Sequence, residues 1–170
     1  MHGDNFTYVL LSGLAIALLI AAFTDLRRRQ IDNWLNAAVA LSAPLFWWAT
    51  GVTIGGIGLQ FLIALATFGI TAGLFAMRAM GGGDVKLLTA LALWIPPMLF
   101  LKFIIVMSLL GAVLTLIFGA WHIATRQRDR VAIPYGVAIS SAGLWALASQ
   151  YLPPFQAAFQ AAMQSPAGLG

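Results

Sequence analysis

The sequence predicts an all-α membrane protein with six transmembrane helices, formed by a single domain over residues 1–170. This fold class follows from a very apolar composition, six separate apolar runs, and basic residues gathered in alternate connections. Of the 170 residues, 61% are hydrophobic and only 8% are charged, and the mean hydropathy is +0.92. A soluble domain carries roughly 25% charged residues. No segment is long and polar enough to fold separately in water, so one integral membrane domain is expected.

Each apolar run is close to the length of about 20 residues that a transmembrane helix needs. The first run ends at Asp25, and the glycine-rich residues 51–56 separate the second from the third. The fourth is the weakest, because Pro96-Pro97 interrupts it and proline kinks or ends a helix. The charged segment 125–133 separates the fifth from the sixth. The predicted spans are residues 8–24, 34–50, 57–76, 85–101, 103–124 and 134–150.

Basic residues predict the orientation of these spans. Cytoplasmic connections of membrane proteins carry an excess of Lys and Arg. The predicted topology places Lys102 alone on one side, so that side is expected to be non-cytoplasmic, together with both termini. Membrane topology also explains the basic pI of about 10.1 better than nucleic-acid binding does, and no nucleic-acid partner is expected. The other side receives eight of the nine Lys and Arg residues: Arg27, Arg28, Arg29, Arg78, Lys86, Arg126, Arg128 and Arg130.

Acidic residues are scarce: the chain has five Asp and no Glu. Asp25 closes the first span and Asp84 opens the fourth, so the topology places both at the cytoplasmic boundary. Ionisable residues are costly in a membrane and are functional candidates by default. Two carboxyl groups held together can share a proton and activate water, which is the chemistry of an aspartyl protease. The helix dipole favours the charge on Asp84, near a helix N-terminus, and the proton on Asp25, near a C-terminus.

Several other chemistries are less well supported by the sequence. The chain has no cysteine, which excludes a cysteine-ligated zinc site, a thiol nucleophile and a disulfide. The carboxyl pair requires neither a metal nor another cofactor, and none is expected. His2 and His122 have no serine partner that a motif would indicate, so a serine protease is disfavoured.

Three motifs resemble those of one family, the type IV prepilin peptidases. Residues 81–87 read Gly-Gly-Gly-Asp-Val-Lys-Leu and resemble the Gly-x-Gly-Asp signature of that family. Residues 24–33 read Thr-Asp-Leu-Arg-Arg-Arg-Gln-Ile-Asp-Asn and are similar to its other motif, an Asp followed by basic residues and Ile-Pro-Asn. Residues 133–138 resemble the Pro-aromatic-Gly stretch that opens the last span. The motifs occur in the order and on the side of the membrane seen in the family.

The resemblance implies a membrane-embedded aspartyl endopeptidase with Asp25 and Asp84 as its catalytic residues. Such an enzyme removes the short basic leader from type IV prepilins or pilin-like proteins at the cytoplasmic face of the bacterial inner membrane. It cuts beside a Gly that precedes the hydrophobic helix of the pilin. The chain resembles the short form associated with Flp (tight-adherence) pili, which lacks the methyltransferase function of larger members. The expected partners are therefore a prepilin substrate and membrane lipid.

Other residues of these motifs are expected to bind substrate or shape the site. Gly81, Gly82 and Gly83 permit positive φ angles and the close approach of another backbone. Lys86 is expected either to orient the carboxyl pair or to extend toward the interface. Asn33 is expected to cap the second span, or to contact substrate. Asp32 replaces the Pro of the family's Ile-Pro-Asn and competes with Asp25 for the first catalytic role.

Two other functions fit parts of the sequence. Membrane carboxylates also relay protons in small ion-coupled transporters. Transporters bind their substrates near the bilayer midplane, however, whereas both carboxylates here are predicted at one interface. A structural subunit of a pilus machine with an inactive site is a third alternative, disfavoured because both motif aspartates are present.

Overall fold

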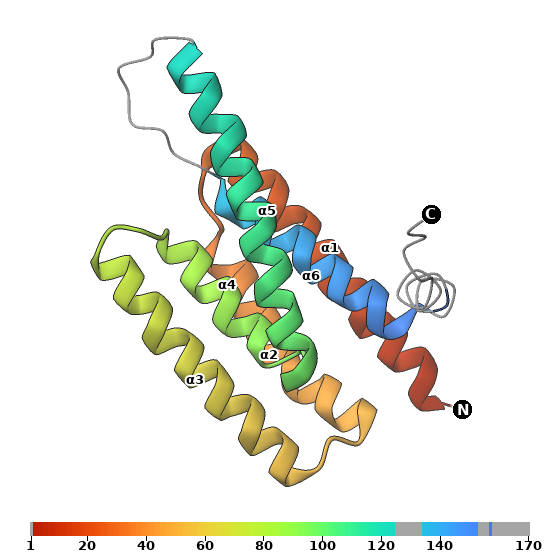
Figure 1. Ribbon diagram of the computed structural model, residues 1–170. Helices are drawn as coiled ribbons and strands as arrows, with labels where there is room; N and C mark the ends of the chain where they lie inside the picture. The colour runs from red at the N-terminus through yellow and green to blue at the C-terminus, as the bar shows by residue number, and fades with distance from the viewer. Residues whose placement is uncertain (1, 125–133, 153–156, 158–170) are drawn as a thin grey trace, which may run out of the picture.

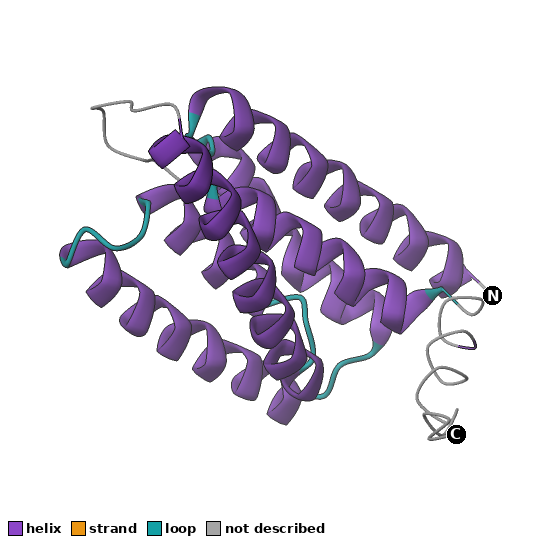
Figure 2. Cartoon of the chain, turned by 45° about the horizontal axis from the view of Figure 1, so that its top comes forward, coloured by secondary structure: helices purple, strands orange, loops and turns teal. Residues whose placement is uncertain are grey.

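The computed structural model describes residues 2–124, 134–152 and 157, and this part of the chain is all-helical, without a strand (Figures 1 and 2). The all-α prediction is confirmed. Six apolar segments between glycine, proline and charged breaks give six helices. They are α1 (His2–Arg28), α2 (Asn33–Thr50), α3 (Ile54–Ala76), α4 (Gly82–Ala92), α5 (Pro97–Ala124) and α6 (Tyr135–Tyr151).

Three helices are long and apolar enough to cross a bilayer: Asn5–Arg28, Ile54–Ala76 and Pro97–Trp121, within the described residues. The outer faces of the bundle carry large apolar side chains, including Ile54, which is 90% exposed, and Trp48, which is 79% exposed. Exposing so much apolar surface to water would be unfavourable, whereas contact with lipid tails carries no such cost. The molecule is therefore built as a membrane protein.

Helix α4 differs most from its predicted span. Residues 85–101 were expected to form one span, but α4 ends at Ala92 and residues 97–101 open α5. The reason is the proline pair: each Pro disfavours helical backbone in the residue before it, and Pro97 fits the first position of the next helix. The 11 residues of α4 extend for only about 17 Å. This is shorter than a hydrocarbon core of about 30 Å.

Two tryptophans fix the C-terminal end of α4 against α2. The last carbonyl groups of a helix lack partners within the helix, and lipid offers them none. Trp47 Nε1 donates a hydrogen bond to the Leu93 carbonyl at 2.7 Å, and Trp94 Nε1 donates to the Val39 carbonyl at 2.7 Å. The ring of Phe46 stacks on Trp94, with centroids 4.7 Å apart. These contacts hold the short helix at a fixed depth in the bundle.

Helix α4 also supplies the centre of the core. Leu87 and Leu91, one turn apart, are both completely buried, because α4 packs against α2, α3 and α6. On the other side of the bundle, α1 and α6 pack along each other and α5 packs on α6. The chain reverses at each of the four described connections, so that residues 29–32 and 77–81 lie at one end of the bundle and residues 51–53 and 93–96 at the other (Figure 1). The third predicted basic connection, 125–133, lies outside the described residues.

Candidate active site

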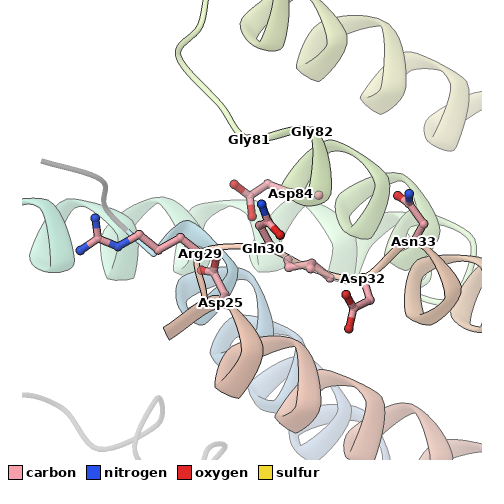
Figure 3. Close-up of a pocket in the computed structure, with 10 residues that line it drawn as sticks. Asp25, Arg29, Gln30, Asp32, Asn33, Gly81, Gly82 and Asp84 are labelled. Carbon is pink, nitrogen blue, oxygen red and sulfur yellow. The ribbon is translucent and has the colours of Figure 1, made fainter. Parts of the chain in front are cut away.

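A hollow of about 320 Å³ opens at the end of the bundle where α1 ends and α4 begins. Its walls come from two parts of the chain that are far apart in the sequence: the end of α1 with the connection to α2, and the turn into α4. Figure 3 shows Asp25 and Asp84 on opposite sides of this hollow. It is lined by Asp25, Arg29, Gln30, Ile31, Asp32, Asn33 and residues 81–84. The structure thus brings together all the residues predicted for the site except Lys86.

Asp84 is held by the way in which α4 begins. Gly81 is the N-cap residue, and Asp84 lies three residues later in the first turn. The carboxyl group of Asp84 reaches back to the Gly81 N–H, as in one half of a capping box. Asp84 is only 8% exposed. Burial, and next the negative charge of nearby Asp25, raise the pKa of Asp84 to about 7, against the lowering effect of the Gly81 N–H.

Asp25 lies at the C-terminal end of α1, where it is 5% exposed, and α6 begins directly against it. The backbone N–H groups of Gly136 and Val137 face its carboxylate, and Arg29 lies nearby. Burial raises the pKa of Asp25, and these three groups partly offset that effect because they stabilise its negative charge. The Oδ2 atom nevertheless makes no hydrogen bond of ordinary geometry to any described residue. This buried oxygen lies against the first turn of α6.

The prediction that Asp84 carries the charge of the pair did not include the groups that pack on Asp25 from outside its own helix. The helix-dipole argument considered only the helix that carries each carboxylate, and it placed the charge on Asp84. The structure adds the N-terminus of α6 opposite Asp25, which no local pattern in α1 reveals. The charge of Asp25 in turn raises the pKa of Asp84. The N–H groups at the start of α6 therefore favour the opposite distribution, with the charge on Asp25 and the proton on Asp84.

Gly136 is required for this arrangement. A Cβ atom built on Gly136 would lie 2.8 Å from Cγ and Oδ2 of Asp25 and 2.9 Å from its Cβ. Non-bonded carbon atoms do not approach so closely. Only glycine therefore lets the first turn of α6 contact the side chain of Asp25. The sequence placed Gly136 in a motif, but its contact with Asp25 was missed.

The three glycines before Asp84 act through close approach and not through unusual backbone angles. Gly81 has φ −73°, and Gly51 is the one described glycine with positive φ. A Cβ on Gly83 would lie 3.1 Å from Ile31 Cβ and 3.3 Å from Ile31 N, and one on Gly81 would lie 3.0 Å from Asp84 Oδ2. The start of α4 can thus rest directly on the segment that follows Asp25.

Asn33 does not cap α2, as one of its two expected roles required. Asp32 occupies the N-cap position but makes no capping hydrogen bond, and Asn33 is already the first helical residue. Instead, Asn33 Oδ1 accepts a hydrogen bond of 2.6 Å from Lys86 Nζ. Lys86 therefore joins α4 to α2, outside the hollow. Asp32 Oδ2 lies 3.7 Å from an Arg28 nitrogen, and its side chain is 39% exposed.

Two further residues near the site were missed. Arg29 lines the hollow and has a φ of 54°, in the left-handed region that a non-glycine residue enters at a cost of about 1–2 kcal/mol. Its role at the site was missed because it belongs to a run of three arginines, and membrane topology accounts for the whole run. Asn36 Nδ2 donates to the Gly83 carbonyl at 3.4 Å, and Asn36 is 4% exposed. The sequence feature that could have indicated Asn36 is a polar residue within the first turn of an otherwise apolar span.

Comparison with known proteins gives one result. The model of the type IV leader peptidase family matches residues 12–116, which is more than half of the chain and includes both Asp25 and Asp84. No curated protein and no solved structure matches the chain.

Proposed function

The chain belongs to the type IV leader peptidase family and is thus a peptidase, and from this premise we propose that it is an aspartyl endopeptidase that removes the leader of type IV prepilins or pilin-like proteins. One observation carries the proposal. Asp25 and Asp84, from different helices, line the same hollow, and the charge of one raises the pKa of the other. Such a pair supplies a general base and a general acid at near-neutral pH.

In the proposed mechanism a water molecule in the hollow attacks the scissile carbonyl carbon. Asp25 takes a proton from this water, while Asp84 gives its own proton to the carbonyl oxygen, which yields a neutral gem-diol. Asp25 then transfers its proton to the leaving nitrogen as the carbon–nitrogen bond breaks. A hydroxyl proton of the gem-diol returns to Asp84, so the pair regains its starting state. No covalent intermediate forms.

We place the hollow at the cytoplasmic boundary of the bacterial inner membrane, with six crossings and both termini on the opposite side. Two observations support this topology. The charged connections 29–32 and 77–81 lie at the same end of the bundle as the hollow, and the chain reverses at the short α4. The excess of Lys and Arg at this end favours the cytoplasm. Substrate leaders, which carry basic residues, would enter from that side.

The proposal is tested by incubating the purified protein, in lipid vesicles, with an Flp-type prepilin. We expect one cleavage, next to a Gly before the hydrophobic segment, which mass spectrometry of the product N-terminus identifies. A small ion-coupled transporter would leave the prepilin intact, and so would an inactive structural subunit. An uncut prepilin in the presence of folded protein would therefore contradict the proposal.

The rate of leader removal is expected to fall as the pH rises through about 7. The carboxyl group of Asp84 must carry a proton to polarise the substrate carbonyl, and its pKa is raised to about 7. Below this pH the acid is present, and above it the rate should approach a tenfold decrease per pH unit. The measurement is kcat/KM from pH 6 to 9 in vesicles of fixed composition. A rate that stays constant across this range would contradict the role of Asp84 as the acid.

A further inference from the structure

A second hollow, of about 330 Å³, lies beside the carboxyl pair and extends away from it along α4. One wall is a single face of α2. Asn33, Asn36, Ala37 and Ala40 contribute to it, and they follow the i, i+3, i+4, i+7 spacing of one helix face. The polar members are nearest the carboxyl pair, and the alanines follow deeper in the bundle. This hollow is called the α2–α4 groove below.

The floor of the α2–α4 groove is a matching face of α4 and its C-cap. Lys86, Thr89, Ala90 and Leu93 have the same spacing, and Phe68 of α3 closes the opposite side. The groove is thus apolar over most of its length and polar at one end. It runs from the start of α4, where Asp84 lies, toward the opposite end of the bundle. In the proposed topology this direction leads from the cytoplasmic boundary into the lipid.

Asn36 gives the polar end of the groove an unused acceptor. Its Nδ2 donates to the carbonyl of Gly83, the residue next to Asp84. Its Oδ1 is buried and has no hydrogen-bond partner among the described residues. A buried acceptor without a partner costs about 1–3 kcal/mol, so such atoms usually have a function. A ligand with a free N–H group would satisfy it.

We propose that the α2–α4 groove binds the hydrophobic segment of the substrate that follows the cleaved bond, with Asn36 Oδ1 accepting a backbone N–H from its first turn. The proposal rests on the function proposed above. The first four N–H groups of a helix lack partners within the helix, and lipid supplies none. An apolar helix that starts at the carboxyl pair and continues into the membrane therefore presents free donors at Asn36 and an apolar face to Ala37, Ala40 and Leu93.

Cross-linking tests this placement directly, because the chain has no cysteine of its own. Ala37→Cys places a thiol in the groove, and Ala38→Cys on the same helix, exposed but outside the groove, is the matched control. Each is combined with an Asp84→Asn change that keeps the Flp-type prepilin intact. Membranes containing prepilins with single cysteines along the hydrophobic segment are then oxidised with copper phenanthroline.

We expect disulfides from Ala37→Cys to prepilin positions spaced three or four residues apart, at least tenfold more than from Ala38→Cys. Equal cross-linking of the two variants would overturn the proposal, and so would disulfides only between two copies of the peptidase. If the unmodified protein cuts prepilin but Ala37→Cys does not cross-link to it, the groove proposal fails while the proposed function stands. A protein that does not cut prepilin would instead contradict the function.

Kinetics test the role of Asn36. Asn36→Leu should raise KM for full-length prepilin at least tenfold, with little change in kcat, because the acceptor is lost. Asn36→Gln keeps both an amide oxygen and an amide N–H and should restore most of the affinity. A short peptide with the leader and cleavage site, but without the hydrophobic segment, should give the same kcat/KM with all three proteins. A similar loss with this peptide would show that Asn36 only positions Asp84, and would overturn its role in binding.

Discussion

Replacing Asp84 or Asp25 with Asn is expected to lower the rate of leader removal at least about 1,000-fold. Asn has the size and shape of Asp but can act neither as a base nor as an acid. Asp25→Asn removes the acceptor of the water proton, and Asp84→Asn removes the donor to the carbonyl oxygen. Both residues are more than nine-tenths buried in the same hollow, so no solvent group can easily replace either. The measurement is kcat on vesicle-bound protein at saturating prepilin.

The matched control is Asp32→Asn, in the same hollow. Asp32 is close to Arg28 and its side chain is 39% exposed, so its charge is largely screened by solvent. We expect this variant to keep the rate of the parent protein within about threefold, because the interaction of an exposed ion pair amounts to no more than about 1 kcal/mol. If Asp32→Asn abolished activity while Asp25→Asn retained it, the catalytic pair would be Asp32 and Asp84, and the proposed mechanism would be wrong.

The outline of the fold follows from the sequence because its determinants are local. Apolar runs, separated by charges, glycines and prolines, limit where a helix in lipid can start and stop, and all six helices were expected. The length of the fourth helix, however, was not predicted correctly. The proline pair indicated a break, but residues 85–101 were still predicted as one span because that length is typical of a transmembrane helix. The structure shows that α4 ends four residues before Pro96. The indole N–H groups of Trp47 and Trp94 stabilise this short helix, because their hydrogen bonds join α2 to the end of α4.

The residues of the hollow were also predictable, since motifs and topology together placed Asp25 and Asp84 at one end of the bundle. The distribution of charge between Asp25 and Asp84 was not predictable. Two of the three groups that favour charge on Asp25 come from α6, more than a hundred residues away in the sequence, and only packing brings them together. The same holds for Asn36, whose contact with Gly83 joins two helices. Motifs show which residues meet, but the surroundings of each carboxylate depend on tertiary contacts.

Gly136→Ala is expected to lower kcat about 100-fold, because displacing a catalytic group by about 1 Å can cost that much. The added methyl group would lie 2.8 Å from Asp25 Cγ, so either α6 or the carboxylate must move. Helix α6 cannot easily retreat, because it packs along α1 on this side and against α5 and α4 on others. The carboxylate would therefore move, away from the N–H groups of Gly136 and Val137 that face it.

The effect of Gly136→Ala should be catalytic and not a loss of folding, since alanine is the better helix former by about 1 kcal/mol. Gly13→Ala on α1 is the matched control, because a methyl group there meets nothing within 4 Å. We expect Gly13→Ala to retain full activity, and both variants to reach the membrane in equal amounts and to resist added protease equally. Since the charge on Asp25 helps to raise the pKa of Asp84, moving Asp25 should also shift the alkaline limb of the pH profile of Gly136→Ala. Full activity of Gly136→Ala with an unchanged pH profile would show that α6 does not position Asp25.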